Sequence, residues 1–94
     1  MLKIRYSAQF KKDYKRVKKQ GRDIAKLAAT LAALATGEKL PERMRDHQLK
    51  GNYHGHRECH IEPDWLLLYR MDAGQLTLTA TRTGSHAEME IFGL

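Results

Sequence analysis

The apolar residues of this chain change from the spacing of helices to the alternation of strands, and this change limits the folds that it can adopt. A short apolar–charged alternation over residues 2–6 predicts a half-buried strand. Ser7 is a suitable N-cap, and the apolar residues after it recur on one helix face, at Phe10, Tyr14 and Val17. This spacing predicts a helix over residues 8–20, which Gly21 ends.

A second helix is predicted by a cleaner apolar stripe, which ends at Gly37. The members of this stripe recur at helical spacing and are Ile24, Leu27, Ala28, Leu31, Leu34 and Ala35. We expect the two helices to pair as a short hairpin, with the lysines of the first helix facing outward.

Beyond a charged loop over residues 38–45, the pattern becomes that of strands. The candidate strands cover residues 47–49, 56–61, 65–69 and 76–81. Pro63 and Asp64 interrupt this ladder, and Gly84 ends the last strand and leaves a tail without a predicted element. We therefore predict a small α+β domain with an N-terminal strand and a two-helix hairpin packed on one face of a twisted, mainly antiparallel sheet of four or five strands.

The chain has 94 residues, which is the size of one domain, residues 1–94. The longest aliphatic stretch, residues 65–69, is far shorter than the ~18–20 residues of a membrane span. The N-terminus lacks the apolar region of a secretory signal. A single cysteine, Cys59, excludes an internal disulfide and is typical of a reducing compartment. We expect a soluble protein of the cytoplasm with no membrane partner.

The net charge of +6 is concentrated in one segment. Residues 11–22 contain seven Lys or Arg and one Asp, so the remainder of the chain is neutral overall. Such a cluster favours a polyanionic partner, either nucleic acid or an acidic protein segment, although a Lys-rich helix face can also be merely solvated. The candidate RNA or ribosome contacts are Lys11, Lys12, Lys15, Lys18 and Lys19.

The histidines all follow position 46 and are His47, His54, His56, His60 and His86. With Cys59 they suggest a zinc site, but structural zinc sites use closely spaced pairs of Cys and His ligands, and this chain has one cysteine. We therefore predict no metal ligand. Cys59 is expected to be a small core residue.

The other interpretation of the histidines is acid–base catalysis near neutral pH. RNA can be cleaved without a metal because the ribose 2′-hydroxyl is the nucleophile, and it needs only a base, a cation at the phosphate and a proton donor. The candidates for these parts are His47, His60 and His86, with Arg82 as the cation. Asp64 can orient a histidine or simply form a turn, and Trp65 can stack on a base or simply fill the core.

Three sequence blocks together resemble the YafQ branch of the RelE/ParE superfamily of bacterial toxins. The blocks are Asp46-His47-x-Leu49-x-Gly51, then Gly55-x-Arg57-x-x-His60-Ile61-Glu62-Pro63-Asp64-Trp65, and finally Arg82-Thr83-Gly84-Ser85-His86-Ala87. The likeness covers about residues 2–87 and includes the lysine-rich first helix. The second and third blocks are specific in combination, and either alone would be weaker.

The resemblance implies a RelE-like domain that is a ribosome-dependent endoribonuclease, cuts translated mRNA without a cofactor, and is neutralised by an antitoxin. The residues at the family's catalytic positions are His47, His60, Asp64 and His86, the last as proton donor. The resemblance also implies a phosphate contact by Arg82 and a part in activity for Trp65. The family's C-terminal functional Phe is replaced by Glu90, so Phe92, or else Met89, is the candidate for that position.

Two alternatives share this fold. A ParE-like poison of DNA gyrase would not need the histidines, and a non-catalytic RNA- or ribosome-binding module would leave Asp64 and residues 82–86 idle. Besides ribosome and mRNA, the expected partner is a ribbon-helix-helix antitoxin with a toxin-wrapping tail, through which operator DNA would be bound only indirectly. Whether His47 or His60 is the general base stays open.

Overall fold

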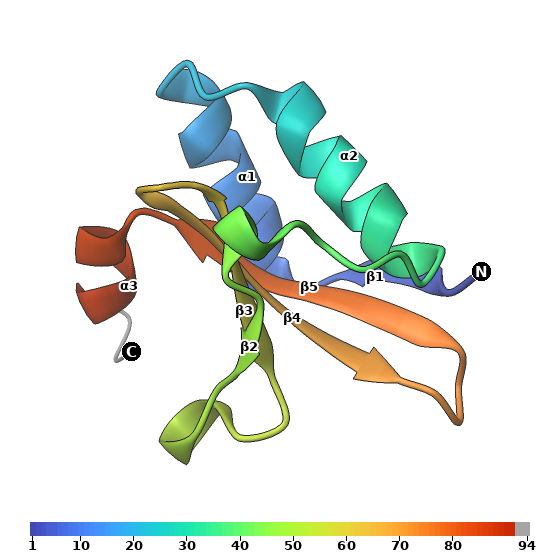
Figure 1. The fold of residues 1–94 in the computed structure, drawn as a ribbon. Coiled ribbons are helices and arrows are strands. Elements are labelled where there is room, and N and C mark those ends of the chain that lie inside the picture. Colours follow the sequence, from blue (N-terminus) through green and yellow to red (C-terminus); the bar gives the residue numbers. More distant parts are fainter. Residues whose placement is uncertain (92–94) are drawn as a thin grey trace.

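The computed structural model of the chain describes residues 1–91, and Figure 1 shows its ribbon. The strands are β1 (Lys3–Tyr6), β2 (His47–Gln48), β3 (Arg57–Glu62), β4 (Trp65–Asp72) and β5 (Thr77–Gly84). The α-helices are α1 (Ala8–Lys19), α2 (Ile24–Ala35) and α3 (His86–Ile91), and single 3₁₀ turns lie at Glu42–Met44 and Gly51–Tyr53. No helix within residues 1–91 combines the length and apolar character needed to cross a membrane.

The strands form one sheet of five in the order β1-β5-β4-β3-β2. β1 runs parallel to β5, and the other neighbouring pairs are antiparallel. A parallel pair cannot be joined by a tight turn, and here both helices of the hairpin and three strands separate β1 from β5 along the chain. The predicted α+β fold with a mainly antiparallel sheet is confirmed.

Helices α1 and α2 lie together on one face of the sheet, where most of the core is buried (Figure 1). Phe10 and Val17 of α1 and Leu27 of α2 belong to one buried cluster with alternate residues of the central strands, among them Cys59 and Leu67. Burial raises the pKa of the Cys59 thiol to about 12. Cys59 is therefore the core residue that the sequence predicts.

Side-chain caps begin both helices of the hairpin. The Ser7 hydroxyl accepts a hydrogen bond from the Phe10 N–H at 2.9 Å, as its position in the sequence predicts. The Asp23 carboxylate caps α2 in the same way, by accepting a hydrogen bond from the Ala25 N–H. Gly21 follows α1 with φ of +79°, a left-handed conformation that glycine adopts without strain, so the chain can turn there into α2.

Helix α3 lies beyond the last element that the sequence analysis predicts. It begins with a capping box, in which the Ser85 N–H donates to Glu88 Oε1 at 2.7 Å and the Glu88 N–H donates to Ser85 Oγ at 3.2 Å. The Ser-x-x-Glu spacing is a known signal for a helix start, and it could have located α3 from the sequence.

The second face of the sheet carries a smaller apolar cluster. Leu66 and Leu68 of β4 are buried there with Met89 of α3, and Leu49 and Tyr53 pack against them. The predicted hairpin of α1 and α2 lies on one face, and α3, which was not predicted, brings Met89 onto the opposite face.

Two exposures differ from the predicted alternation. Leu76, the first residue of the predicted strand 76–81, lies in a turn with φ of +53° before β5 begins and is 64% exposed. Tyr6 lies on β1 and is 47% exposed, with its ring stacked on Phe10.

Candidate active site

Strand pairing arranges the candidate residues in two rows across the sheet. The first row joins His47, Glu58, Leu68 and Arg82. The second row, nearer to the turn between β3 and β4, joins His60, Leu66 and Gly84. Because paired residues project to the same face, both histidines lie over the apolar floor of Leu66 and Leu68, on the face that α1 and α2 leave uncovered.

Asp64 and His86 meet at the end of the second row. In the sheet, the start of β4 is paired with the end of β5. The turn residue Asp64, just before β4, therefore lies beside His86, the first residue of α3. Asp64 Oδ1 accepts a hydrogen bond from the His86 backbone N–H at 2.9 Å and contacts the His86 ring Nδ1 at 2.7 Å. Because an ionised carboxylate only accepts hydrogen bonds, Nδ1 carries the proton in this pair and Nε2 is the nitrogen left for chemistry.

His86 also favours the ionised form of Asp64. The backbone hydrogen bond first, and the ring hydrogen bond second, lower the pKa of the Asp64 carboxyl below its usual range. The carboxylate therefore stays ionised throughout the neutral range and continues to accept both hydrogen bonds from His86.

His60 lies against His86, with ring centroids 5.4 Å apart and an interplanar angle of 42°. Its Nδ1 is buried and has no hydrogen-bond partner among residues 1–91. A bulge in the pairing between His60 and Glu62 leads into the turn that carries Asp64, and such bulges are common where a strand must aim a side chain at a site. The structure thus brings together His60, Asp64 and His86.

His47 lies farther from this cluster, on the edge strand β2. Its Nδ1 is 2.7 Å from the carbonyl oxygen of Arg45, so Nδ1 is the protonated nitrogen of the neutral ring. Its Nε2 is 3.6 Å from Glu58 Oε1. Glu58 was not selected from the sequence, although the alternation of β3 already placed it on the same side as His60.

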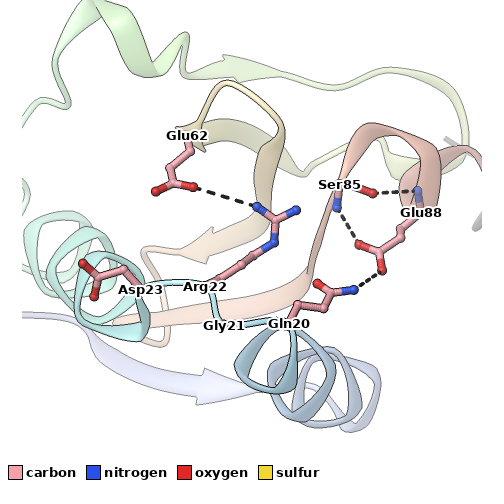
Figure 2. A pocket seen from close by; sticks show the side chains of 7 residues that line it. All are labelled: Gln20, Gly21, Arg22, Asp23, Glu62, Ser85 and Glu88. Atoms are coloured by element: carbon pink, nitrogen blue, oxygen red, sulfur yellow. Dashed lines mark hydrogen bonds and ion pairs between the residues drawn. The ribbon is translucent and has the colours of Figure 1, made fainter.

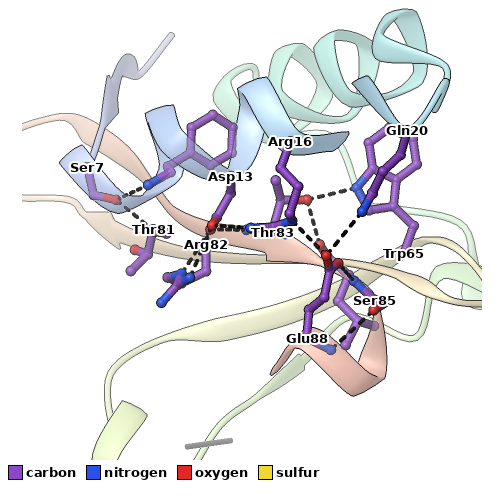
Figure 3. Close-up of polar contacts among 12 residues, drawn as sticks. Ser7, Asp13, Arg16, Gln20, Trp65, Thr81, Arg82, Thr83, Ser85 and Glu88 are labelled. Atoms are coloured by element: carbon purple, nitrogen blue, oxygen red, sulfur yellow. Dashed lines mark hydrogen bonds and ion pairs between the residues drawn. The ribbon is translucent and has the colours of Figure 1, made fainter. Parts of the chain in front are cut away.

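Arg82 was predicted to bind phosphate, but its guanidinium is turned toward a buried carboxylate (Figure 3). Arg82 is 8% exposed, and its Nε and Nη2 donate to the Asp13 carboxylate at 2.8 and 3.1 Å. Asp13 is 1% exposed and also accepts the Thr83 backbone N–H at 3.1 Å. A buried carboxylate requires a cationic partner, and in this structure Arg82 and Arg16 together compensate the charge of Asp13. The phosphate contact of Arg82 stays a prediction.

Trp65 was predicted to contact substrate, and in this structure it is 0% exposed. Its Nε1 donates to Thr83 Oγ1 at 2.8 Å, and that hydroxyl donates to the Leu66 carbonyl at 2.7 Å. The guanidinium carbon of Arg22 lies 5.5 Å from the centroid of the indole. Trp65 is therefore a core residue with a satisfied indole N–H.

A polar pocket of about 480 Å³ lies between the α1–α2 turn, the β3–β4 turn and the start of α3 (Figure 2). It is lined by Gln20, Gly21, Arg22, Asp23, Glu62, Ser85 and Glu88. Arg22 Nη2 donates to the Asp64 carbonyl at 3.2 Å, so one wall of the pocket is attached to the turn that carries Asp64.

The other histidines lie outside the cluster. His54 is exposed in the loop between β2 and β3, and His56 meets Tyr53 edge-on with centroids 5.6 Å apart. Within the described part of the chain, no group of three or more His, Cys, Asp or Glu side chains is placed to hold a metal ion. Met89 belongs to the apolar floor, and Phe92 lies outside the described residues.

The predicted lysine face is exposed along α1, at Lys11, Lys12, Lys15, Lys18 and Lys19. Beside it, an apolar groove of about 660 Å³ runs between α1 and α2. Three of the lysines and seven other residues line this groove: Lys11, Lys15, Lys18, Tyr6, Phe10, Tyr14, Ile24, Leu27, Ala28 and Leu31. The surface therefore presents cations next to apolar side chains.

Known proteins are similar to this chain over most of its length. The family model for the bacterial toxin of type II toxin–antitoxin systems, YafQ, matches residues 2–91. The mRNA interferase toxin YafQ of Escherichia coli K12 is 38% identical over 87 residues, which are 92% of each chain.

Solved structures agree in fold. The crystal structure of a metal-bound toxin from Helicobacter pylori matches with a TM-score of 0.89 at 42% identity, over 95% of this chain and 99% of that one. A chain of the E. coli DinJ–YafQ complex matches with a TM-score of 0.85 at 37% identity, over 95% and 98% of the two chains. Sequence and fold therefore lead to one assignment: the chain belongs to the YafQ family of toxins of bacterial type II toxin–antitoxin systems.

Proposed function

We propose that this toxin is an mRNA interferase, an endoribonuclease that cleaves mRNA on the translating ribosome and is neutralised by a cognate antitoxin. The observation that carries the proposal is the cluster of His60, Asp64 and His86 at one end of the uncovered sheet face. The similarity to an E. coli mRNA interferase toxin supports it. Because ribosomes and mRNA are the proposed targets, the protein would act in the cytoplasm.

In the proposed reaction the RNA provides the nucleophile. A base removes the proton of a ribose 2′-hydroxyl, the 2′ oxygen bonds to the adjacent phosphorus, and the bond from phosphorus to the 5′ oxygen breaks. An acid donates a proton to the departing 5′ oxygen, which leaves a 2′,3′-cyclic phosphate and a 5′-hydroxyl. A positioned side chain contributes about 10²–10⁴-fold to such a proton transfer.

His86 is the proposed acid. Asp64 holds the ring through Nδ1, so that Nε2 can present a proton to the leaving oxygen. His60, whose ring lies 5.4 Å from that of His86, is a proposed base, and His47 is the other candidate because its Nε2 can accept a proton. The protonated imidazole of His86 would also bring positive charge to the phosphate.

Helix α1 is the proposed contact for ribosomal RNA and for the antitoxin. Its exposed lysines can neutralise RNA phosphates. The groove beside them fits an amphipathic acidic segment, with apolar residues against Phe10 and Leu27 and carboxylates near Lys11 and Lys15. An antitoxin seated there would cover the lysines and compete with the ribosome. DinJ accompanies the E. coli relative in its crystal structure.

Single-turnover cleavage on programmed ribosomes tests the proposed acid. We expect His86→Ala to slow cleavage by about 10²–10⁴-fold with little change in ribosome affinity, whereas His54→Ala, a change at an exposed loop histidine, should cleave normally. A 5′-thio leaving group needs no proton donor, so it should restore cleavage by His86→Ala but not by His60→Ala. Rescue of neither variant, or a loss of binding alone, would remove His86 from this role.

A further inference from the structure

The geometry points to the Arg16–Glu88 ion pair as the device that positions His86. Neither of these side chains takes part in the contact between Asp64 and the His86 ring, and we propose that they act through the backbone of α3. The inference rests on the proposed function, since it takes His86 to be catalytic.

Glu88 connects the start of α3 to helix α1. Its Oε1 accepts the Ser85 N–H at 2.7 Å, which secures the residue immediately before His86 (Figure 2). Its Oε2 forms an ion pair with Arg16 Nε at 2.7 Å and accepts a hydrogen bond from Gln20 Nε2 at 3.2 Å. One carboxylate therefore joins the cap of α3 to two side chains of α1.

Arg16 is itself anchored in the buried part of the molecule. Its Nη1 donates to Asp13 Oδ1 at 2.9 Å, and its Nη2 donates to the Thr83 carbonyl at 2.7 Å (Figure 3). The guanidinium is thus fixed by α1 and β5 together. A continuous chain of contacts runs from the buried Asp13 through Arg16 and Glu88 to the start of α3.

The length of α3 makes this anchor necessary. The helix has six residues, and a helix of that length is unstable in isolation. His86 is its first residue, so the ring moves with the first turn of the helix. Met89 packs the apolar side of the helix against the sheet. At its N-terminal end, Asp64 accepts the His86 N–H, and Glu88 is the polar contact that joins this end to α1.

Gly84 leaves the space that this ion pair occupies. A Cβ atom at Gly84 would lie 2.7 Å from Arg16 Nη2 and 2.8 Å from Glu88 Oε1, both shorter than van der Waals contact. Its backbone φ is outside the left-handed region, so alanine at this position would displace the ends of the Arg16 and Glu88 side chains without straining the backbone. Gly84→Ala therefore disturbs the same pair without removing any of its groups.

The test compares Glu88→Ala with Glu88→Gln, and Glu38→Ala is the control because Glu38 is an exposed glutamate in the loop after α2. We expect Glu88→Ala to lower single-turnover cleavage by about 10-fold to 10²-fold at saturating ribosome, with little change in the half-saturating concentration. Glu88→Gln keeps the capping oxygen and loses the charge, so it should recover part of the rate. Glu38→Ala should match the parent protein.

A second measurement does not depend on cleavage. In ¹H–¹⁵N spectra of the histidine rings, Glu88→Ala and Gly84→Ala should shift the His86 resonances and leave those of His54 unchanged. Circular dichroism reports whether each variant is folded. His86 signals and cleavage like those of the parent in folded Glu88→Ala would overturn the inference. Full activity of His86→Ala would instead overturn the proposed function, so the two failures are distinguishable.

Discussion

Asp64 holds His86 at two points through a single oxygen, which contacts both the backbone N–H and the ring nitrogen Nδ1. The same carboxylate therefore satisfies an N–H at the start of α3 and selects the ring tautomer. A change at Asp64 should affect the helix start and the chemistry of the histidine together.

The Asp64–His86 contact should be visible in an acid titration. The folded-state pKa of Asp64 is lowered, so the contact stabilises the fold above the unfolded-state pKa and this contribution is lost as the pH falls through the folded-state pKa. A ¹³C titration of the side-chain carboxyl measures it directly. In His86→Ala the pKa should rise part of the way, because the backbone N–H remains. Equal titration in both proteins would contradict the assignment.

Replacing Arg82 should damage stability before it affects chemistry. Arg82→Ala removes one of the two cations that contact the buried Asp13 carboxylate. Because Arg16 still contacts Oδ1, the loss should stay below the ~3–5 kcal/mol of a buried charge left without any partner. Denaturant unfolding followed by circular dichroism measures the loss. Arg70→Ala, a change at an exposed arginine of the neighbouring strand β4, should cost far less. A fully stable Arg82→Ala with weakened RNA binding would return Arg82 to the role of a phosphate contact.

The fluorescence of Trp65 should report a buried indole. Its ring is 0% exposed, so emission should be blue-shifted from that of free tryptophan and acrylamide should quench it poorly. Trp65 is the only tryptophan of the chain, so the signal is unambiguous. Addition of a non-cleavable RNA should leave the emission unchanged. Strong quenching by bound RNA would show that a base reaches the ring.

The lysines of α1 should determine how ribosome binding depends on salt. Changing Lys11, Lys15 and Lys18 to Gln should lower the log–log slope of affinity against salt by roughly 0.7–0.9 for each phosphate that the variant no longer neutralises. The control is the same change of charge at exposed lysines elsewhere, Lys3, Lys39 and Lys50. If both triple variants bind equally well, the lysine face of α1 is only solvated.

Cleavage should not depend on an added metal ion, because the ribose 2′-hydroxyl is the nucleophile and the histidines move the protons. The similar toxin from Helicobacter pylori has a metal-bound crystal structure, so the effect of metal on cleavage can be compared between the two proteins. EDTA should leave the rate unchanged when enough magnesium remains to keep ribosomes intact. Loss of cleavage that zinc or copper restores would require a metal in the reaction.

The sequence by itself determined the local structure and the faces of the strands. Helix positions follow from the apolar spacing and from Ser7, because a helix start depends on contacts within one turn. The alternation of β3 placed Cys59 in the core and His60 on the other face, because successive strand residues point to opposite sides. α3 was missed although its capping signal, Ser85 and Glu88, is equally local.

Only the tertiary structure decided which distant groups meet. Arg82 and Asp13 are 69 positions apart in the sequence. No local pattern shows that the buried carboxylate of Asp13 on α1 pairs with the guanidinium of Arg82, the side chain that was predicted to contact phosphate. The burial of Trp65 likewise depends on Thr83 of β5, whose hydroxyl accepts a hydrogen bond from the indole N–H. His86 meets Asp64 because antiparallel pairing sets the start of β4 beside the end of β5, and that register is a property of the whole sheet.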